Sequence, residues 1–148
     1  MRISAIMGSI LALFFFAPFA RAADITGKPD IVAGDTLVIA GTQIRLYGID
    51  APAYETTCSA GGKPWFCGQE AAFALADAVG RTWVECDLKD AGTLEVMVGV
   101  CRVGGPIGRD LGAWMVSEGW ARADRNVAPG YGPLEDAAKA KGLGIWRR

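Results

Sequence analysis

The sequence predicts an α+β domain in which a small closed barrel of five short strands is accompanied by three α-helices. Two patterns support this prediction. Short apolar runs are separated by glycine-containing turns, and apolar residues with helical spacing occur once between the runs and twice after them. Closure into a barrel would leave no unpaired edge strand. The 148 residues suit a single domain of this kind.

The start of the chain has the features of a secretory signal peptide. Arg2 supplies a positive charge, residues 3–16 form an apolar run, and an A-x-A sequence ends at Ala22. We therefore predict a signal peptide of residues 1–22, a mature domain of residues 23–148, and a secreted or periplasmic location. An uncleaved membrane anchor is the alternative, but the apolar run is short for a membrane span and Pro18 follows it.

The charge balance of the predicted mature domain opposes nonspecific binding to nucleic acid. Cleavage would remove two of the 15 basic residues, Arg2 and Arg21, and none of the 16 acidic residues. The remaining net charge would be 13 minus 16, that is −3. Because such binding depends on cations that neutralise phosphates, an acidic domain is poorly suited to it.

The first predicted elements are three short strands followed by a helix. Residues 31–32, 36–39 and 44–46 are apolar runs separated by glycines, as in a meander of strands. From Gln69 to Val79 the apolar residues recur with helical spacing. This segment is the first predicted helix.

The second half predicts a hairpin and two more helices. Residues 82–87 and 94–103 are rich in strand-forming residues, and residues 89–92 between them favour a turn. Asp110 is a good N-cap for a helix over residues 111–118. A last helix is predicted over residues 134–141, after a loop rich in glycine and proline.

All four cysteines lie in the predicted exported domain, where disulfides are favoured. Cys58 and Cys67 flank a glycine-rich loop, and Cys86 and Cys101 lie on successive strand-like runs, so we predict pairing between neighbours. Zinc is the rival interpretation. The absence of histidine and of C-x-x-C spacing from the sequence argues against it.

Two groups of motifs resemble the staphylococcal nuclease (thermonuclease) family over nearly the whole mature chain. The first group is Gly34-Asp35-Thr36-Leu37, Gly41 and Ile44-Arg45-Leu46-Tyr47-Gly48-Ile49-Asp50-Ala51-Pro52, and the second is Met115-Val116, Gly119-Trp120-Ala121, Ala138-Lys139 and Gly144-Ile145-Trp146. The resemblance implies an OB-type five-stranded barrel with three helices. It also implies, in active members, a calcium-dependent phosphodiesterase that acts on DNA and RNA.

The resemblance assigns candidate roles to four residues. Asp35 and Asp50 match the family's metal carboxylates, and Ala51 stands where a backbone carbonyl would complete the calcium site. Arg45 matches a phosphate-binding arginine, whose planar fork can hold two oxygens. The alternatives are an ordinary turn aspartate at position 35 and an ion pair between Arg45 and Asp50.

Three departures from the family pattern predict impaired catalysis. Ala53 occupies the position of the catalytic glutamate, and Val96 occupies that of the second catalytic arginine. Ala33 stands where many members carry an acid, so calcium should bind weakly at most. Glu55 is the alternative general base, but it lies two residues from the expected position.

The aromatic residues divide into core candidates and loop candidates. Trp114, Trp120 and Trp146 fall in the helical half at positions typical of packing. Trp65 and Tyr131 lie in loops, where stacking on a ligand is the alternative to packing.

These observations leave two hypotheses for function. The favoured one is a noncatalytic binding or scaffold domain, and the other is a weak calcium-dependent nuclease. OB-type barrels bind oligonucleotides or oligosaccharides. The resemblance also includes exported members linked with exopolysaccharide production. We expect a monomer.

Overall fold

The computed structural model describes residues 24–93 and 96–148. The predicted signal peptide, residues 1–22, lies outside this range. Within it, every helix is too short or too polar to cross a membrane.

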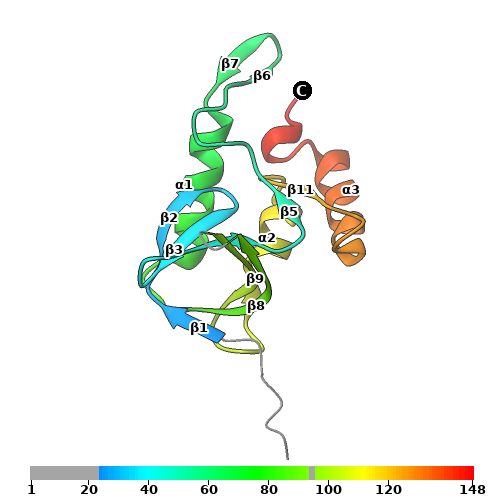
Figure 1. Ribbon diagram of the computed structural model, residues 1–148. Coiled ribbons are helices and arrows are strands. Elements are labelled where there is room, and N and C mark those ends of the chain that lie inside the picture. Colours follow the sequence, from blue (N-terminus) through cyan, green and yellow to red (C-terminus); the bar gives the residue numbers. More distant parts are fainter. Residues whose placement is uncertain (1–23, 94–95) are drawn as a thin grey trace, which may run out of the picture.

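One curved sheet forms the barrel-like half of the molecule (Figure 1). Its hydrogen-bonded order is β1 (Asp24–Gly27), β8 (Val84–Thr93), β9 (Val96–Val103), β4 (Thr42–Leu46), β3 (Thr36–Ile39) and β2 (Asp30–Ala33), and the short β10 (Arg109–Asp110) pairs with β9. The β4–β9 pairing is parallel and the others are antiparallel.

The two ends of this strand order are consecutive in the chain. Only Lys28 and Pro29 separate β1 from β2, and β1 also contacts β3. Pro29 has no N–H to donate, so it cannot take part in a strand pairing between β1 and β2. The five strands predicted from the sequence correspond to β2, β3, β4, β8 and β9, and β1 is an additional strand that was not predicted. The hydrogen-bonded ladder itself does not close.

Three α-helices and several short elements complete the α+β fold. The helices are α1 (Cys67–Val79), α2 (Leu111–Ser117) and α3 (Gly132–Lys141). Short strands form two further pairs, β5 (Ile49–Asp50) with β11 (Arg122–Ala123) and β6 (Cys58–Ala60) with β7 (Lys63–Trp65). Two 3-10 turns, η1 (Pro129–Tyr131) and η2 (Gly144–Trp146), flank α3. The predicted fold class is confirmed.

The main hydrophobic core lies between the inner face of the sheet and helices α1 and α2. Its fully buried side chains include Leu37 and Ile44 from the sheet, Leu75 from α1, and Leu111 and Met115 from α2. These positions alternate along the strands and recur with helical spacing along the helices. The core explains why the apolar pattern of the sequence predicts the element types correctly.

The predicted hairpin differs from the observed one at its turn. The residues predicted as the turn, Lys89–Gly92, lie inside β8, which continues to Thr93 with register shifts after Leu88 and after Asp90. Bulged strands accept residues that otherwise favour turns. The sequence analysis also missed β1, β5, β6, β7, β10 and β11, since strands of two to four residues carry too little periodicity to be recognised.

Both disulfides join the neighbours expected from the sequence. Cys58–Cys67 closes the β6–β7 hairpin onto the start of α1. Cys86–Cys101 joins directly opposed residues of β8 and β9 in the core. No cysteine remains free for zinc.

Candidate functional site

Arg45 lies between the two aspartates that the sequence singles out. Asp35 follows the end of β2 and is 5% exposed, while Asp50 ends β5 and is exposed. The Nη2 atom of Arg45 donates to Oδ2 of Asp35 and to Oδ1 of Asp50, each at 3.2 Å. The alternative ion pair between Arg45 and Asp50 is therefore present, and it extends to Asp35.

Both oxygens of Asp35 already accept hydrogen bonds. The Thr36 hydroxyl donates to Oδ1 at 2.8 Å, and the Ala51 amide donates to Oδ2 at 3.2 Å. Gly34 allows the close approach of this turn, because a Cβ there would lie 3.0 Å from Ala51. The Asp35 carboxylate is thus held in one orientation.

These residues fit a calcium site poorly. Calcium takes six to eight oxygen ligands, whereas Asp35 and Asp50 share one guanidinium and Ala51 turns its N–H toward Asp35. Ala33, at the end of β2, adds no charge. Across the two described ranges, no cluster of three or more acidic, cysteine or histidine side chains could hold a metal ion.

Two adjoining hollows flank Asp50. The first, of about 320 Å³, surrounds Arg45 and is lined by Arg45, Leu46, Gly48, Ile49, Asp50, Val98, Asp124 and Val127. The second, of about 220 Å³, is lined by Asp50, Ala51, Pro52, Thr56, Cys58, Arg122 and Ile145. Because Asp50 lines both, a single carboxylate separates two places where a ligand could sit.

Hydrogen bonds from residues outside the first hollow fix the loop that carries Val127. The Tyr47 hydroxyl donates to the Val127 carbonyl at 3.0 Å. Arg125 joins the same loop to α3 through Glu135, at 2.9 Å. Burial raises the pKa of Glu135, but hydrogen bonds from Arg125 and Lys139 outweigh burial, so the pKa falls below its ordinary value.

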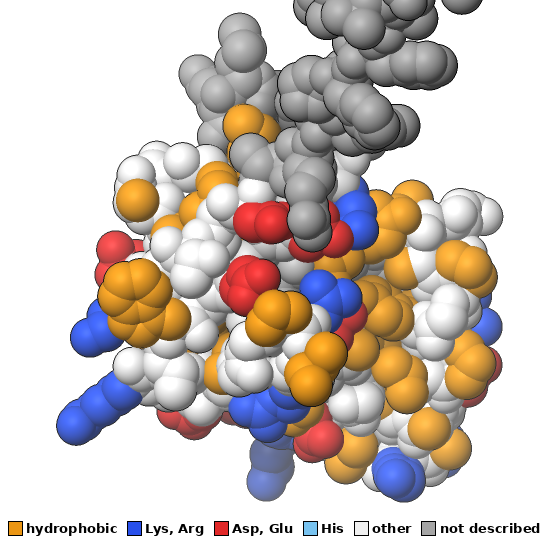
Figure 2. Space-filling model, turned by 90° about the horizontal axis from the view of Figure 1, so that it is seen from below, with side chains coloured by type: hydrophobic (Ala, Val, Ile, Leu, Met, Phe, Trp, Pro, Cys, Tyr) orange, Lys and Arg blue, Asp and Glu red, His pale blue; other side chains and the backbone are white. Residues whose placement is uncertain are grey.

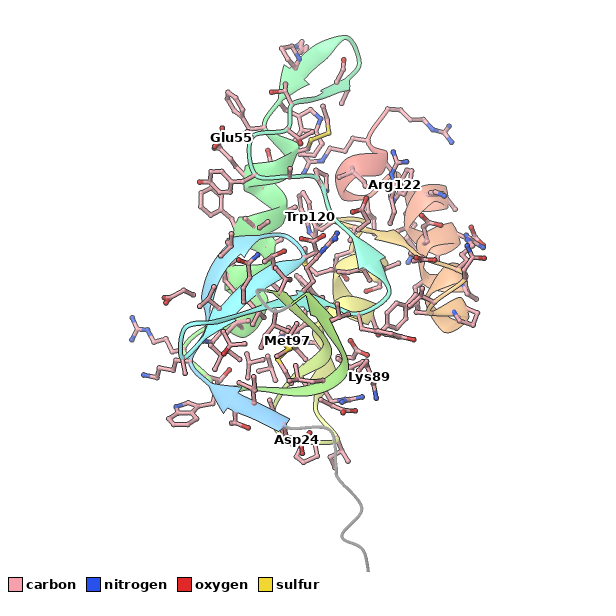
Figure 3. All side chains as sticks on the ribbon, viewed as in Figure 1. Asp24, Glu55, Lys89, Met97, Trp120 and Arg122 are labelled. Atoms are coloured by element: carbon pink, nitrogen blue, oxygen red, sulfur yellow. A yellow bond between two sulfur atoms is a disulfide. The ribbon has the colours of Figure 1, made fainter. Side chains whose placement is uncertain are left out.

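The positions predicted to have lost catalytic groups line neither hollow, although Pro52, next to Ala53, lines the second one. Ala53 and Glu55 are exposed in the loop after β5 and line neither hollow. Figure 3 shows Glu55 beside α1, well separated from Arg122. Val96 begins β9, where it is half-buried and pairs with Gln43 of β4. Within the described parts of the chain, Asp124 is the other carboxylate that lines the Arg45 hollow, and its Oδ1 already accepts from the amides of Asn126 and Val127, at 3.0 and 3.3 Å.

Trp65 packs within the protein. Its ring meets Trp120 edge-on with centroids 6.4 Å apart, and the Arg147 guanidinium lies 4.3 Å from the Trp65 centroid. On a neighbouring ring, Lys139 and Arg122 lie 4.4 and 5.4 Å from the centroid of Trp146. Trp65 is thus the anchor of the disulfide-closed hairpin.

Trp114 and Trp120 pack against the main core, as predicted, while Trp146 lies outside it and is half-buried beneath the cations. Tyr131 also packs, and its hydroxyl donates to Oδ2 of Asp110 at 2.7 Å. Burial, together with the Asp110 carboxylate, raises the pKa of Tyr131 above its ordinary range. Packing therefore accounts for both loop candidates, Trp65 and Tyr131.

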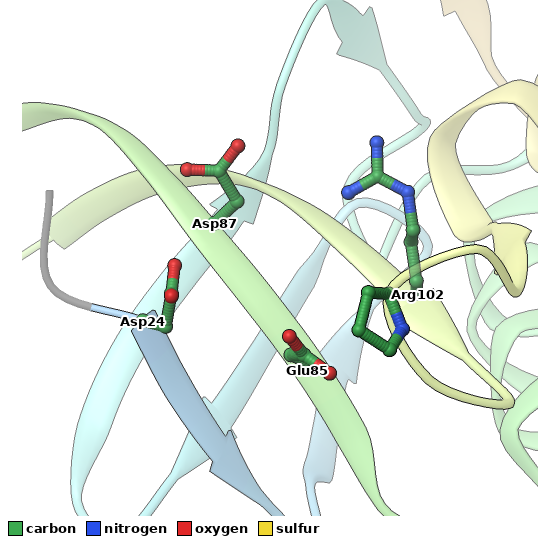
Figure 4. Close-up of a pocket in the computed structure, with 5 residues that line it drawn as sticks. Asp24, Glu85, Asp87 and Arg102 are labelled. Carbon is green, nitrogen blue, oxygen red and sulfur yellow. The ribbon is translucent and has the colours of Figure 1, made fainter. Parts of the chain in front are cut away.

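A third hollow, of about 170 Å³, lies at the far end of the barrel and is lined mainly by acids. Asp24 of β1, Glu85 and Asp87 of β8, and Arg102 of β9 surround it (Figure 4). Seen from this end, red acidic side chains gather on the surface (Figure 2). Asp24 and Arg122 lie at opposite ends of the molecule (Figure 3). Arg102 lines this third hollow and not the one that surrounds Arg45, so it does not take the place of the missing arginine.

Comparison with known proteins places this geometry in context. Residues 43–148 match the family model described as "Staphylococcal nuclease homologue". The chain is also similar to the succinoglycan biosynthesis protein ExoI of Rhizobium meliloti (strain 1021). The two are 31% identical over 146 residues, which cover 95% of this chain and 75% of that protein.

Proposed function

This chain belongs to the staphylococcal nuclease homologue family, and we propose that it binds a polymer without hydrolysing it. The observation that carries the proposal is that the phosphate-binding arginine is kept, whereas the position of the general base is not occupied by a carboxylate. Arg45 is held by Asp35 and Asp50, whereas Ala53 and Glu55 place no carboxylate in either hollow.

The missing groups have large expected effects on hydrolysis. Loss of a general base costs about 10²–10⁴ in rate, and loss of one charge-stabilising donor costs about 10²–10³. Ala53 cannot take a proton, and Val96 cannot donate to a phosphate. The two losses need not add, but either one leaves a poor enzyme. We also propose that calcium binds weakly at most.

We propose an oligosaccharide segment of an exopolysaccharide as the polymer. The similar protein of Rhizobium meliloti is named for succinoglycan biosynthesis, and OB-type barrels bind oligosaccharides as well as oligonucleotides. The predicted mature net charge of −3 disfavours a polyphosphate ligand. Two buried or half-buried disulfides suit the secreted or periplasmic location implied by the predicted signal peptide.

A nuclease assay tests the absence of hydrolysis. Purified residues 23–148 are incubated with plasmid, single-stranded DNA and RNA, in calcium or in chelator, and the products are separated on a gel. We expect the substrates to stay intact. Calcium-dependent cleavage that Glu55→Gln abolishes would show that a relocated carboxylate performs hydrolysis, and the noncatalytic proposal would be wrong.

A weak calcium-dependent nuclease is the second candidate function. The observation that favours it is the assembly of Asp35, Arg45 and Asp50 within 3.2 Å contacts at one site. Arg45→Gln in the same assay separates the two candidates. Any true residual cleavage at this site should fall with Arg45→Gln, whereas a contaminating nuclease would be unaffected.

A further inference from the structure

We propose that the hollow between Asp50 and Arg122 is a binding site for one sugar ring of an oligosaccharide. This inference rests on the proposed function, because it names the place and the chemistry of the ligand. The hollow of about 220 Å³ is separate from the one that surrounds Arg45, although Asp50 lines both.

The walls of this hollow are fixed by covalent and hydrogen-bonded contacts. Asp50 and Arg122 are directly opposed in the β5–β11 pair. Cys58, on a second wall, is bonded to Cys67 at the start of α1. On the third wall, the Ile145 amide donates to the Gly119 carbonyl at 2.8 Å. Three separate segments thus form a site whose shape does not depend on a ligand.

Arg122 has donors available to a ligand. Unlike Arg45, Arg125 and Arg147, it forms no ion pair with a carboxylate in the described ranges. Its guanidinium lies 5.4 Å from the centroid of the Trp146 ring. Stacking on an aromatic ring restricts the guanidinium without using its N–H groups. Arg122 therefore presents a positioned set of donors at the rim of the hollow.

The lining matches the mixed chemistry of a sugar. Asp50 uses Oδ1 for Arg45, and its side chain is 71% exposed, so it can also accept from a ligand hydroxyl. The Thr56 hydroxyl can donate or accept. Ala51, Pro52 and Ile145 supply an apolar wall for the C–H groups of a ring. A polyhydroxy ring offers donors, acceptors and C–H groups together.

A nucleic acid fits the same hollow poorly. Single-stranded nucleic acids are held by aromatic stacking and by cationic grooves, but no aromatic side chain from the described residues lines this hollow. The nearby rings of Trp65 and Trp146 are already in cation–π contact with Arg147 and Lys139, respectively. The Asp50 carboxylate in the lining would also repel a phosphate. The observations therefore favour a sugar.

The size of the hollow supports a single ring. Sites for drug-sized ligands span about 300–1,000 Å³, and this hollow of about 220 Å³ is smaller. A longer chain would continue past Asp50 into the first hollow. We expect binding to strengthen from short to longer oligosaccharides, since a second ring would gain contacts there.

Calorimetric titration with size-fractionated succinoglycan oligosaccharides tests this site. Residues 23–148 should bind them, and Arg122→Gln should weaken binding about 10- to 100-fold, because hydrogen bonds to a charged group are lost. Thr56→Val, which keeps the shape and removes one hydroxyl, should weaken binding about 2- to 10-fold. Circular dichroism and intact disulfides show whether each variant is folded.

Arg81→Gln is the matched control. It makes the same charge change at an exposed arginine beyond the other end of α1, about 20 Å from the end at Cys67. It should bind like the unmodified domain. A single-stranded oligodeoxythymidylate is titrated in parallel as the nucleic-acid probe, and we expect no binding.

The outcomes separate the inference from the proposed function. If no oligosaccharide binds the unmodified domain, the proposed exopolysaccharide ligand is wrong and the inference fails with it. If oligosaccharides bind and folded Arg122→Gln binds equally well, only the inference is overturned. If Arg122→Gln weakens oligodeoxythymidylate binding instead, the site exists but the sugar assignment is wrong.

Discussion

Arg45 pairs with two carboxylates through one guanidinium, and this arrangement determines how the site should respond to cations. A calcium ion at Asp35 and Asp50 would compete with Arg45, the Thr36 hydroxyl and the Ala51 amide for the same carboxylates. Arg45 offsets part of the negative charge that a divalent cation would otherwise meet at Asp35 and Asp50. Its residues match the family pattern, yet their contacts stabilise the fold.

We therefore predict only a small stabilisation by calcium. At millimolar calcium the melting temperature should rise by less than about 2 °C, because a ligand at its dissociation constant contributes only about 0.4 kcal/mol. Differential scanning calorimetry with calcium, magnesium and chelator measures the shift. A large rise specific to calcium that Asp50→Asn removes would reveal a competent metal site.

At the scale of elements, Tyr131 and Asp110 connect the start of α2 to the turn before α3. Asp110 Oδ1 accepts from the Ala113 amide as an N-cap, and Oδ2 accepts from the Tyr131 hydroxyl. Loss of either hydrogen bond leaves the Asp110 carboxylate, which is half-buried, with one partner fewer. This link should be sensitive to alkaline pH.

Folding raises the pKa of Tyr131 above the ordinary value of about 10. The folded state therefore holds the phenol proton more tightly than the unfolded state does. Its contribution to the free energy of unfolding is complete below about pH 10 and is lost as the pH rises toward the folded pKa. Urea unfolding at several pH values should show this loss.

Tyr131→Phe should remove that part of the pH dependence and lower stability at neutral pH by about 1 kcal/mol. Tyr54→Phe is the matched control, since Tyr54 is 39% exposed. It should leave the alkaline profile unchanged. Equal profiles for the unmodified domain and Tyr131→Phe would contradict the predicted linkage.

The two disulfides should differ in their resistance to reductant. Cys86 and Cys101 are both fully buried, whereas Cys58 is half-buried and lines a hollow. Thiol–disulfide exchange requires access to a sulfur. Mild reductant on the folded domain should therefore open Cys58–Cys67 first, as alkylation and mass spectrometry would show. Earlier opening of Cys86–Cys101 would contradict this prediction.

At the scale of the whole molecule, two glycines join the end of the chain to the end of α2. Gly119 has φ 78° and Gly144 has φ 51°, and a Cβ on either would overlap backbone of the opposite segment. The resulting contact holds η2 in place, and η2 carries Ile145 and Trp146. The C-terminal segment thus depends on two residues without side chains.

Gly144→Ala should destabilise the domain by more than about 1 kcal/mol, because it combines a strained φ with a backbone overlap. The matched control is Gly130→Ala, where a Cβ would meet nothing within 4 Å. Thermal unfolding of both variants measures the difference. Equal melting temperatures would show that the contact between Gly119 and Gly144 is unimportant for stability.

Much of this protein follows from local sequence patterns. Alternation and helical spacing predict the strands and helices because each buries one apolar face, as Leu37, Leu75 and Met115 do. Asp110 caps the start of α2 as predicted, because capping depends on neighbouring residues. The signal peptide and the proposed oligosaccharide ligand stay predictions.

The sequence by itself determined the family, the fold class, the cysteine pairing and the residues gathered near Arg45, because these depend on patterns over short or aligned segments. Only the tertiary structure decided that Arg45 bridges Asp35 and Asp50, that Trp65 packs beneath Arg147, and that Arg122 faces a second hollow across Asp50. Each of these contacts joins segments distant in the chain. Their geometry depends on how the whole chain packs, and a local pattern does not encode it.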